Sequence, residues 1–179
     1  MSRGKIIIAG PCSKTAFVAF LVLTTVGGLA TASAQPADII AIDKAFQGYY
    51  ARGNYPAAQI EAQRLERLAK ARFGADHPYY AVALNKLGIV IHAQGKYGEA
   101  EGLFKRVLAI REKALGSRHP DVGQTLHNLA FAYTNQGKYT DAEGLYKRAL
   151  VIREKALGTS HPDVAQTLNN LALILVGVL

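Results

Sequence analysis

The chain has 179 residues, of which 50% are hydrophobic, with a single cysteine and a formal net charge of +8. One cysteine excludes an internal disulfide framework, so core packing must hold the fold together. Basic and acidic residues are interleaved, without a dense Lys/Arg run or aromatic residues alternating with the basic ones. Nucleic-acid binding is therefore not expected.

The first 34 residues have the composition of a secretory signal. They begin with three basic residues, Arg3, Lys5 and Lys14. An uncharged stretch from Thr15 to Ala30 follows, and Ala32-Ser33-Ala34 then presents small residues at the positions that signal peptidase reads. We expect cleavage after Ala34, which would leave residues 35–179 as a repeat domain with a net charge of +5.

Cleavage implies an exported protein, periplasmic or secreted, that is not inserted in a membrane afterwards. The alternative is a protein that an uncleaved signal anchors in the membrane. The uncharged stretch is about 16 residues long, whereas a helix that spans a bilayer needs roughly 20. Its length therefore favours cleavage.

The sequence after the signal repeats with a period of 42 residues. The segment His119-Pro120-Asp121-Val122 recurs as His161-Pro162-Asp163-Val164, and Gly95-Lys96-Tyr97 recurs as Gly137-Lys138-Tyr139. A fixed period of this size indicates a repeat array. Arrays of this kind build extended binding surfaces and seldom build a catalytic pocket.

Each unit is predicted to form a helix, a tight turn, a longer helix and a loop. The first unit, 36–76, keeps only this skeleton. Ala45 stands where the other units carry leucine, and Ala62 stands where they carry Phe104 or Tyr146. We interpret this unit as an N-terminal cap, because the end of an array faces water.

The units 77–118 and 119–160 carry clearer helix signals. The first helix of unit 119–160 has apolar residues 3, 4 and 7 positions apart, at Leu126, Leu129, Ala130 and Tyr133. Pro120 suits the first position of that helix, and Gly137 suits the reversal after it. Thr140 and Glu143 have the spacing of a capping box, which predicts that the second helix is capped by Thr140.

The last unit, 161–179, contains only a first helix. In register, the polar turn Tyr133–Gly137 corresponds to the apolar tail Leu175–Leu179. A lone first helix cannot bury both of its apolar sides. Three interpretations remain: a piece of a longer array, a terminal cap, or self-association through this C-terminal helix.

The pattern resembles the tetratricopeptide repeat family, in particular the 42-residue variety of kinesin light chains. Residues 119–158 and 161–175 follow that consensus nearly residue for residue, and 77–116 follows it with Gly88 for alanine and Ile91 for tyrosine. The resemblance implies an all-α fold, a right-handed superhelical array of antiparallel helix pairs. It also implies that the first helices line a concave groove.

The resemblance places a mixed set of polar and apolar residues in this groove. They are Asn85, Lys86, Ile89, His92, Gln124, His127, Asn128, Phe131, Asn135, Gln166, Asn169 and Asn170. In groove-binding relatives, an asparagine at the position of Asn128 and Asn170 bonds to the main chain of an extended peptide, since an amide both donates and accepts. Asparagine is also a poor helix former, so several on one face favour a ligand-binding role. Lys86 and His92 would favour an acidic segment.

His77, His119 and His161 occur once per unit, just before a helix. Neighbouring helices pack roughly 8–10 Å apart, whereas shared metal ligation needs about 2 Å. We therefore predict no metal site and interpret these residues as loop histidines that bond to the backbone. The sequence has no nucleophile, Walker or zinc-binding motif, so neither catalysis nor a cofactor is expected.

The sequence thus predicts a non-catalytic scaffold that binds a peptide or protein segment in a concave groove. One alternative is the N-terminal part of a larger exported enzyme, with a protease-like domain beyond Leu179. The other is a module that self-assembles through the unfinished last helix.

Overall fold

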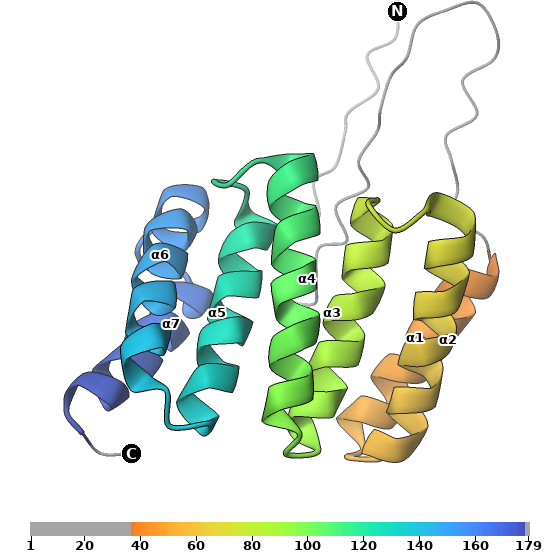
Figure 1. The fold of residues 1–179 in the computed structure, drawn as a ribbon, viewed down its shortest axis with the longest axis horizontal. Coiled ribbons are helices and arrows are strands. Elements are labelled where there is room, and N and C mark those ends of the chain that lie inside the picture. The colour runs from red at the N-terminus through yellow and green to blue at the C-terminus, as the bar shows by residue number, and fades with distance from the viewer. Residues whose placement is uncertain (1–36, 178–179) are drawn as a thin grey trace, which may run out of the picture. The chain divides into compact units, whose positions relative to one another are not determined.

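Seven α-helices and no strand make up residues 37–177, the part of the chain that the structure, a computed structural model, describes (Figure 1). The helices are α1 (Ala37–Ala51), α2 (Tyr55–Phe73), α3 (Pro78–Ala93), α4 (Tyr97–Leu115), α5 (Pro120–Asn135), α6 (Tyr139–Leu157) and α7 (Pro162–Leu175). Each helix packs against the next, so α1–α2, α3–α4 and α5–α6 form consecutive pairs. The predicted all-α array of helix pairs is confirmed, and the predicted signal, 1–34, lies outside the described residues.

The loop histidines start the helices α3, α5 and α7. The Nδ1 atom of His77 accepts a hydrogen bond from the Tyr79 N–H at 3.1 Å. His119 and His161 make the same bond to the N–H two residues on, at 3.2 Å and 3.1 Å. A proline follows each histidine at the first helical position, where no N–H is needed. The interpretation of these residues as backbone-bonded loop histidines is confirmed.

The second helices α4 and α6 start without a side-chain cap, whereas the side chain of Asn54 caps α2. α6 begins at Tyr139 with Lys138 in the cap position, and no side chain bonds to its free N–H groups. The capping box predicted at Thr140 is therefore wrong. Gly137, with φ 75°, reverses the chain so tightly that the helix starts one residue before Thr140. Glu143 instead forms an (i, i+4) ion pair with Lys147 at 2.5 Å.

One aromatic ring fills the space between the two helices of each pair. In α3–α4 a Cβ atom on Gly88 would lie 2.7 Å from Phe104 Cε1, so the ring packs directly on the glycine. In α5–α6 Tyr146 packs in one cluster with Ala130. The first pair reverses this arrangement. Its first helix carries the ring and its second helix the small residue, with Phe46 and Ala62 buried in one cluster.

A buried arginine joins each later pair to the next. Arg111 of α4 donates to the Asp121 carbonyl and to the Thr125 hydroxyl of α5, both at 2.8 Å. Arg153 of α6 makes the same two bonds to α7, at 2.9 Å and 2.7 Å. In the joint between α2 and α3, the equivalent residues are the buried Ala69 and Ala83. The first joint is therefore apolar, and the two later joints are hydrogen-bonded.

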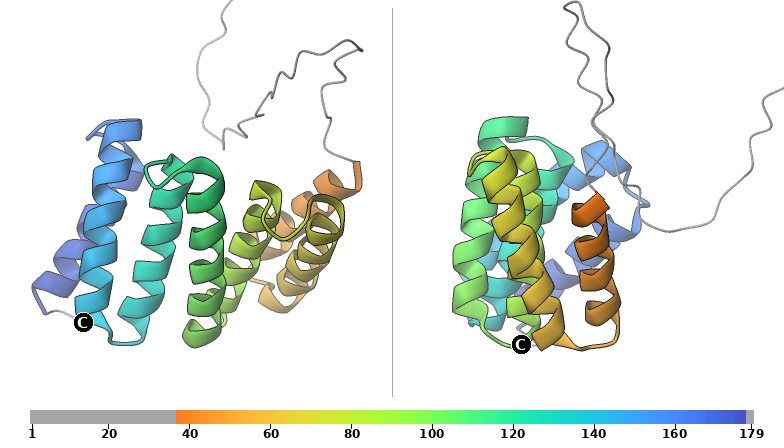
Figure 2. Two further views of the ribbon diagram at one scale, coloured as in Figure 1. Left: turned by 45° about the horizontal axis from the view of Figure 1, so that its top comes forward. Right: turned by 90° about the vertical axis from the view of Figure 1, so that its right-hand side faces the viewer.

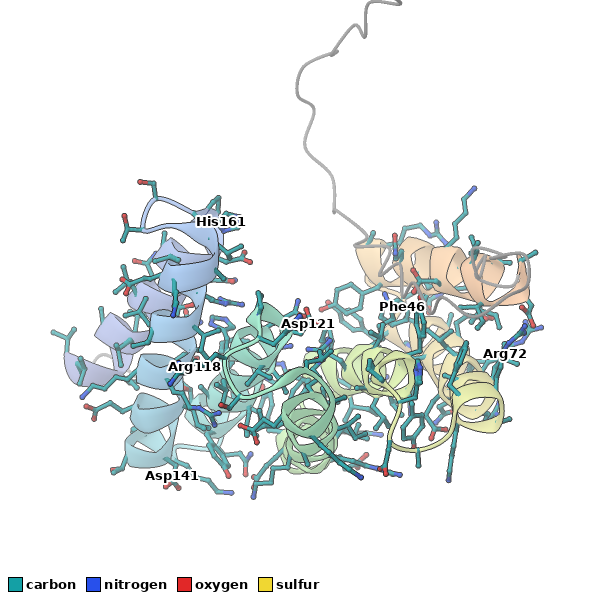
Figure 3. All side chains as sticks on the ribbon, turned by 90° about the horizontal axis from the view of Figure 1, so that it is seen from above. Phe46, Arg72, Arg118, Asp121, Asp141 and His161 are labelled. Carbon is teal, nitrogen blue, oxygen red and sulfur yellow. The ribbon has the colours of Figure 1, made fainter. Side chains whose placement is uncertain are left out.

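The first helices lie on the inner side of a curved array. α3 contacts α5, and α5 contacts α7. The second helices α2, α4 and α6 do not contact one another to the same extent. Figure 2 shows the pairs side by side in chain order. The pairs also turn relative to one another, because in Figure 3 α4 is seen almost end-on and α6 from the side. The exposed side of α1, α3, α5 and α7 is therefore the inner face.

Candidate functional site

Rows of equivalent residues run across the inner face, one from each first helix. One row is Lys44, Lys86, Asn128 and Asn170. A second is Gln47, Ile89, Phe131 and Leu173, and a third is Ile40, Val82, Gln124 and Gln166. Every one of these side chains is exposed or half-buried. The inner face therefore offers cations and amides beside an apolar row, all open to a ligand.

Contacts between successive first helices hold part of this face in place. Lys86 Nζ lies 2.8 Å from Asp43 Oδ1 of α1, and the ammonium also lies over the Phe46 ring. Asn128 Nδ2 donates to Asn85 Oδ1 at 3.2 Å. Such bonds restrict the rotamers of Lys86 and Asn128, so less side-chain entropy is lost when a ligand binds.

Two predicted groove residues are not accessible to a ligand. Asn85 is 6% exposed and His127 is 5% exposed, because both point toward the next first helix. His127 Nδ1 lies 3.2 Å from the Thr167 hydroxyl, and its ring meets Tyr146 edge-on. Both residues are therefore corrected from ligand contacts to packing contacts between helices.

Phe131 is the aromatic residue among the three rows of the inner face. It is 41% exposed, and its ring centroid lies 4.7 Å from that of His92. Tyr97 supports His92 from the other side at 5.0 Å, and Asn135 Nδ2 lies 3.2 Å from His92 Nε2. Burial lowers the pKa of His92, partly opposed by its interaction with the Phe131 backbone. A neutral His92 is thus favoured, which weakens the expectation that it attracts an acidic segment.

Four of the remaining predicted residues lie on the surface of the inner face: Gln124 and Gln166 are exposed, and Ile89 and Asn170 are half-buried. Asn169 is exposed at the position where Asn85 and His127 face the next first helix. The sequence prediction missed Ile40, Lys44 and Gln47 of α1, which continue the same rows. A 42-residue step back from Val82, Lys86 and Ile89 would have found them. The divergence of the first unit concealed their equivalence.

The described residues contain no group of three His, Cys, Asp or Glu side chains that could hold a metal ion. Between 37 and 177, none of the helices combines the length and the apolar character needed to cross a membrane. A curved array of helix pairs with an open, mixed-polarity inner face defines the class of helical repeat scaffolds. Such proteins use an extended surface rather than an enclosed pocket.

Family models described as tetratricopeptide repeat match residues 47–113, 83–134 and 122–163. The chain belongs to the tetratricopeptide repeat family. Members of this family generally act as non-catalytic scaffolds for protein–protein interaction. The comparison with curated proteins gives no match.

Several solved structures are similar. A kinesin light chain protein from Podosopora anserina with nearly identical TPR-like repeats has 25% identity and a TM-score of 0.71, over 78% of this chain and 66% of that one. BtubC (BKLC) from P. vanneervenii has 21% identity and a TM-score of 0.71, over 82% and 59%. The type III secretion translocator chaperone SycD of Yersinia enterocolitica shares the fold at 15% identity and a TM-score of 0.60, over 86% and 96%. The chain thus spans less than two thirds of the length of BtubC and about that share of the Podosopora protein.

Proposed function

We propose that the protein is a non-catalytic scaffold that binds an extended peptide or protein segment across the inner face of α3, α5 and α7. One observation carries this proposal: the apolar row contains a large ring, Phe131, that is exposed yet held in a fixed position by His92. An exposed aromatic residue costs solvation free energy in the free protein. A ligand side chain that covers it recovers that free energy.

The spacing of the rows fits an extended segment. Packed helices lie roughly 8–10 Å apart, and an extended chain rises about 3.3 Å per residue. A segment that crosses the first helices therefore brings about every third side chain over the apolar row. Asn128 and Asn170 can bond to the main chain of that segment, because an amide has both donors and an acceptor.

A peptide-display selection against residues 35–179 tests the groove. We expect the selected peptides to carry apolar residues at every third position. Phe131→Ala should weaken their binding about tenfold, the loss of roughly 1.4 kcal/mol of contact. Asn128→Ala with Asn170→Ala should weaken it similarly and leave the helicity intact.

Val151→Ala is the matched control, because Val151 is an apolar residue on α6, 66% exposed and outside the rows of first-helix residues. This variant should bind the selected peptides as the parent does. Peptides that bind the Phe131 and asparagine variants at full strength would contradict the groove.

We also propose that the protein is exported, on the composition of residues 1–34 alone. Periplasmic extract and medium from an expressing bacterium should contain a chain that starts at Gln35, which intact-mass measurement detects. A chain that keeps its first 34 residues and sediments with membranes would favour the uncleaved anchor instead.

A further inference from the structure

Three successive first helices carry the same pair of contacts on the inner face. In each helix a hydrogen-bond donor lies one helical turn before an apolar side chain. The pairs are Lys86 and Ile89 on α3, Asn128 and Phe131 on α5, and Asn170 and Leu173 on α7. All six side chains are exposed or half-buried. A ligand whose own structure repeats at the interval of the helices can therefore use every pair.

The interval between the pairs distinguishes two extended conformations. The first helices of successive units contact one another, α3 with α5 and α5 with α7, and packed helices lie roughly 8–10 Å apart. A polyproline II helix has three residues per turn and rises about 3.1 Å per residue, so side chains on one face recur about every 9 Å. In a β-strand side chains on one face recur about every 6.6 Å, and residues three apart point to opposite faces. Of the two, the polyproline II helix fits the interval.

The polar side chains of the three rows are all able to donate hydrogen bonds. They are Lys44, Gln47, Lys86, Gln124, Asn128, Gln166 and Asn170. None of the three rows contains a carboxylate. Proline has no N–H, so the main chain of a proline-rich segment offers mainly carbonyl oxygens. In polyproline II these oxygens make no internal hydrogen bonds and are free to accept from side chains. The rows therefore match a main chain that accepts hydrogen bonds.

The charges around the rows favour a neutral segment over an acidic one. Lys86 is balanced by Asp43, whose Oδ1 lies 2.8 Å from Lys86 Nζ, and only 17% of the Lys86 side chain is exposed. Asp121 and Asp163 lie one helical turn before the glutamines of the third row. These carboxylates would repel the acidic side chains of a ligand. A proline-rich segment without acidic residues avoids that repulsion.

We propose that the segment bound across the inner face is a neutral, proline-rich polyproline II helix. It places an apolar side chain at every third position over Ile89, Phe131 and Leu173, and its carbonyl groups accept from Asn128 and Asn170. This inference rests on the proposed groove and adds the conformation and the composition of the ligand. Because a proline-rich chain already populates this conformation, little conformational entropy is lost on binding.

Two labelled peptides are the probes, one with four repeats of Pro-Pro-Leu and one with four repeats of Thr-Thr-Leu. Both place leucine at every third position, but threonine favours β-structure. Binding to the full chain is measured by fluorescence anisotropy. We expect the proline peptide to bind at least tenfold more tightly than the threonine peptide, because it is preorganised and presents its leucines on one face.

Two variants of the protein test the contacts. Phe131→Ala should weaken binding of the proline peptide about tenfold, whereas the control Val151→Ala should not change it. Asn128→Asp should also weaken binding about tenfold, because a carboxylate keeps the size of the amide but cannot donate to a carbonyl. Gln63→Glu is its matched control, since it makes the same change on α2, outside the rows. This control should bind the proline peptide as the parent does.

The proposal is overturned if the threonine peptide binds as tightly as the proline peptide, or if Asn128→Asp binds the proline peptide at full strength. Displayed peptides that require Phe131, together with a proline peptide that does not bind, would keep the groove and reject the polyproline II ligand. Failure of all these peptides to bind across Phe131 would reject the groove as well, so the two proposals fail in different ways.

Discussion

The side chain of His127 is held in the core by hydrogen bonds that define its protonation state. The Thr167 hydroxyl donates to the Asp163 carbonyl at 2.7 Å and accepts from Arg153. Its remaining lone pair can therefore accept from His127 Nδ1, which assigns the proton of the neutral ring to that nitrogen. Burial, with Arg153 nearby, lowers the pKa of His127 to about 4.

This pKa predicts acid sensitivity of the folded state. The folded pKa of about 4 lies below the ordinary histidine value of about 6.5, so the unfolded chain binds more protons between these two values. The stabilisation is complete above about pH 6.5 and is lost as the pH falls toward 4. Between pH 7 and pH 5 we expect His127 to account for a loss of up to about 2 kcal/mol, measured by urea unfolding.

His127→Asn is the control for this effect, because Asn85 occupies the equivalent position in the preceding unit. The variant should lose less stability than the parent between pH 7 and pH 5, while the contribution of His92 remains in both. Identical pH profiles of the two proteins would show that His127 titrates normally.

The sequence could not distinguish His127 from its neighbour Asn128. Both lie on the same side of a helix by period, and both are polar. His127 is buried because α7 packs beside it, whereas the equivalent Asn169 is exposed because no further helix follows among the described residues. Burial at the position of His127 depends on whether a following unit packs against it. The apolar pattern within one helix does not contain that information.

At the scale of the helix pair, the position of the ring matters less than its presence. The sequence showed Ala62 as a departure from Phe104 and Tyr146. It did not show that Phe46, on the opposite helix, fills the space that Ala62 leaves. The repeat alignment compares equivalent positions in successive units, so it does not reveal this compensation. What is kept is the summed side-chain volume where the two helices of a pair meet, which only a comparison of the two helices with each other shows.

Moving the aromatic ring from the second helix to the first can be tested in the pair α3–α4. Phe104→Ala should destabilise the protein by about 3–5 kcal/mol, because it opens a cavity beside Gly88. Adding Gly88→Phe should restore part of that loss by copying the arrangement of Phe46 and Ala62. Gly88→Phe alone should destabilise strongly, since its Cβ already meets the Phe104 ring. A double variant that is no more stable than the worse single variant would contradict volume exchange.

At the scale of the whole molecule, the fold was more predictable than the surface. A 42-residue period fixes the number of helices per unit and the loops between them, and the histidine and glycine positions set where helices start and stop. The inner face is less predictable, because its accessible residues are those left uncovered by neighbouring units. The buried arginines were missed for a related reason: Arg111 resembles a solvent-facing residue until α5 is placed against it.

Arg111 tests how strongly the array behaves as one cooperative unit. Arg111→Ala removes the donor to the Thr125 hydroxyl and one of the two side-chain donors to the Asp121 carbonyl, and should cost about 2–4 kcal/mol. Because each unit contacts only its neighbours, we expect unfolding to separate into two steps, with faster hydrogen exchange in α5–α7. Arg106→Ala, an exposed change on the same helix, should leave a single transition near the parental midpoint.

The joint that Arg111 makes between α4 and α5 and the joint that Arg153 makes between α6 and α7 are interchangeable. This determines where repeat units can be added to the array or removed from it. The contacts from α4 to α5 match those from α6 to α7. A duplication of residues 119–160 would therefore insert a unit with both ends already compatible, and a deletion of the same segment would leave a matched joint. The alanine joint at Ala69 and Ala83 does not allow this exchange. A gained or lost unit thus keeps its joints matched only on the C-terminal side, where each added or removed unit changes every row of the inner face by one position.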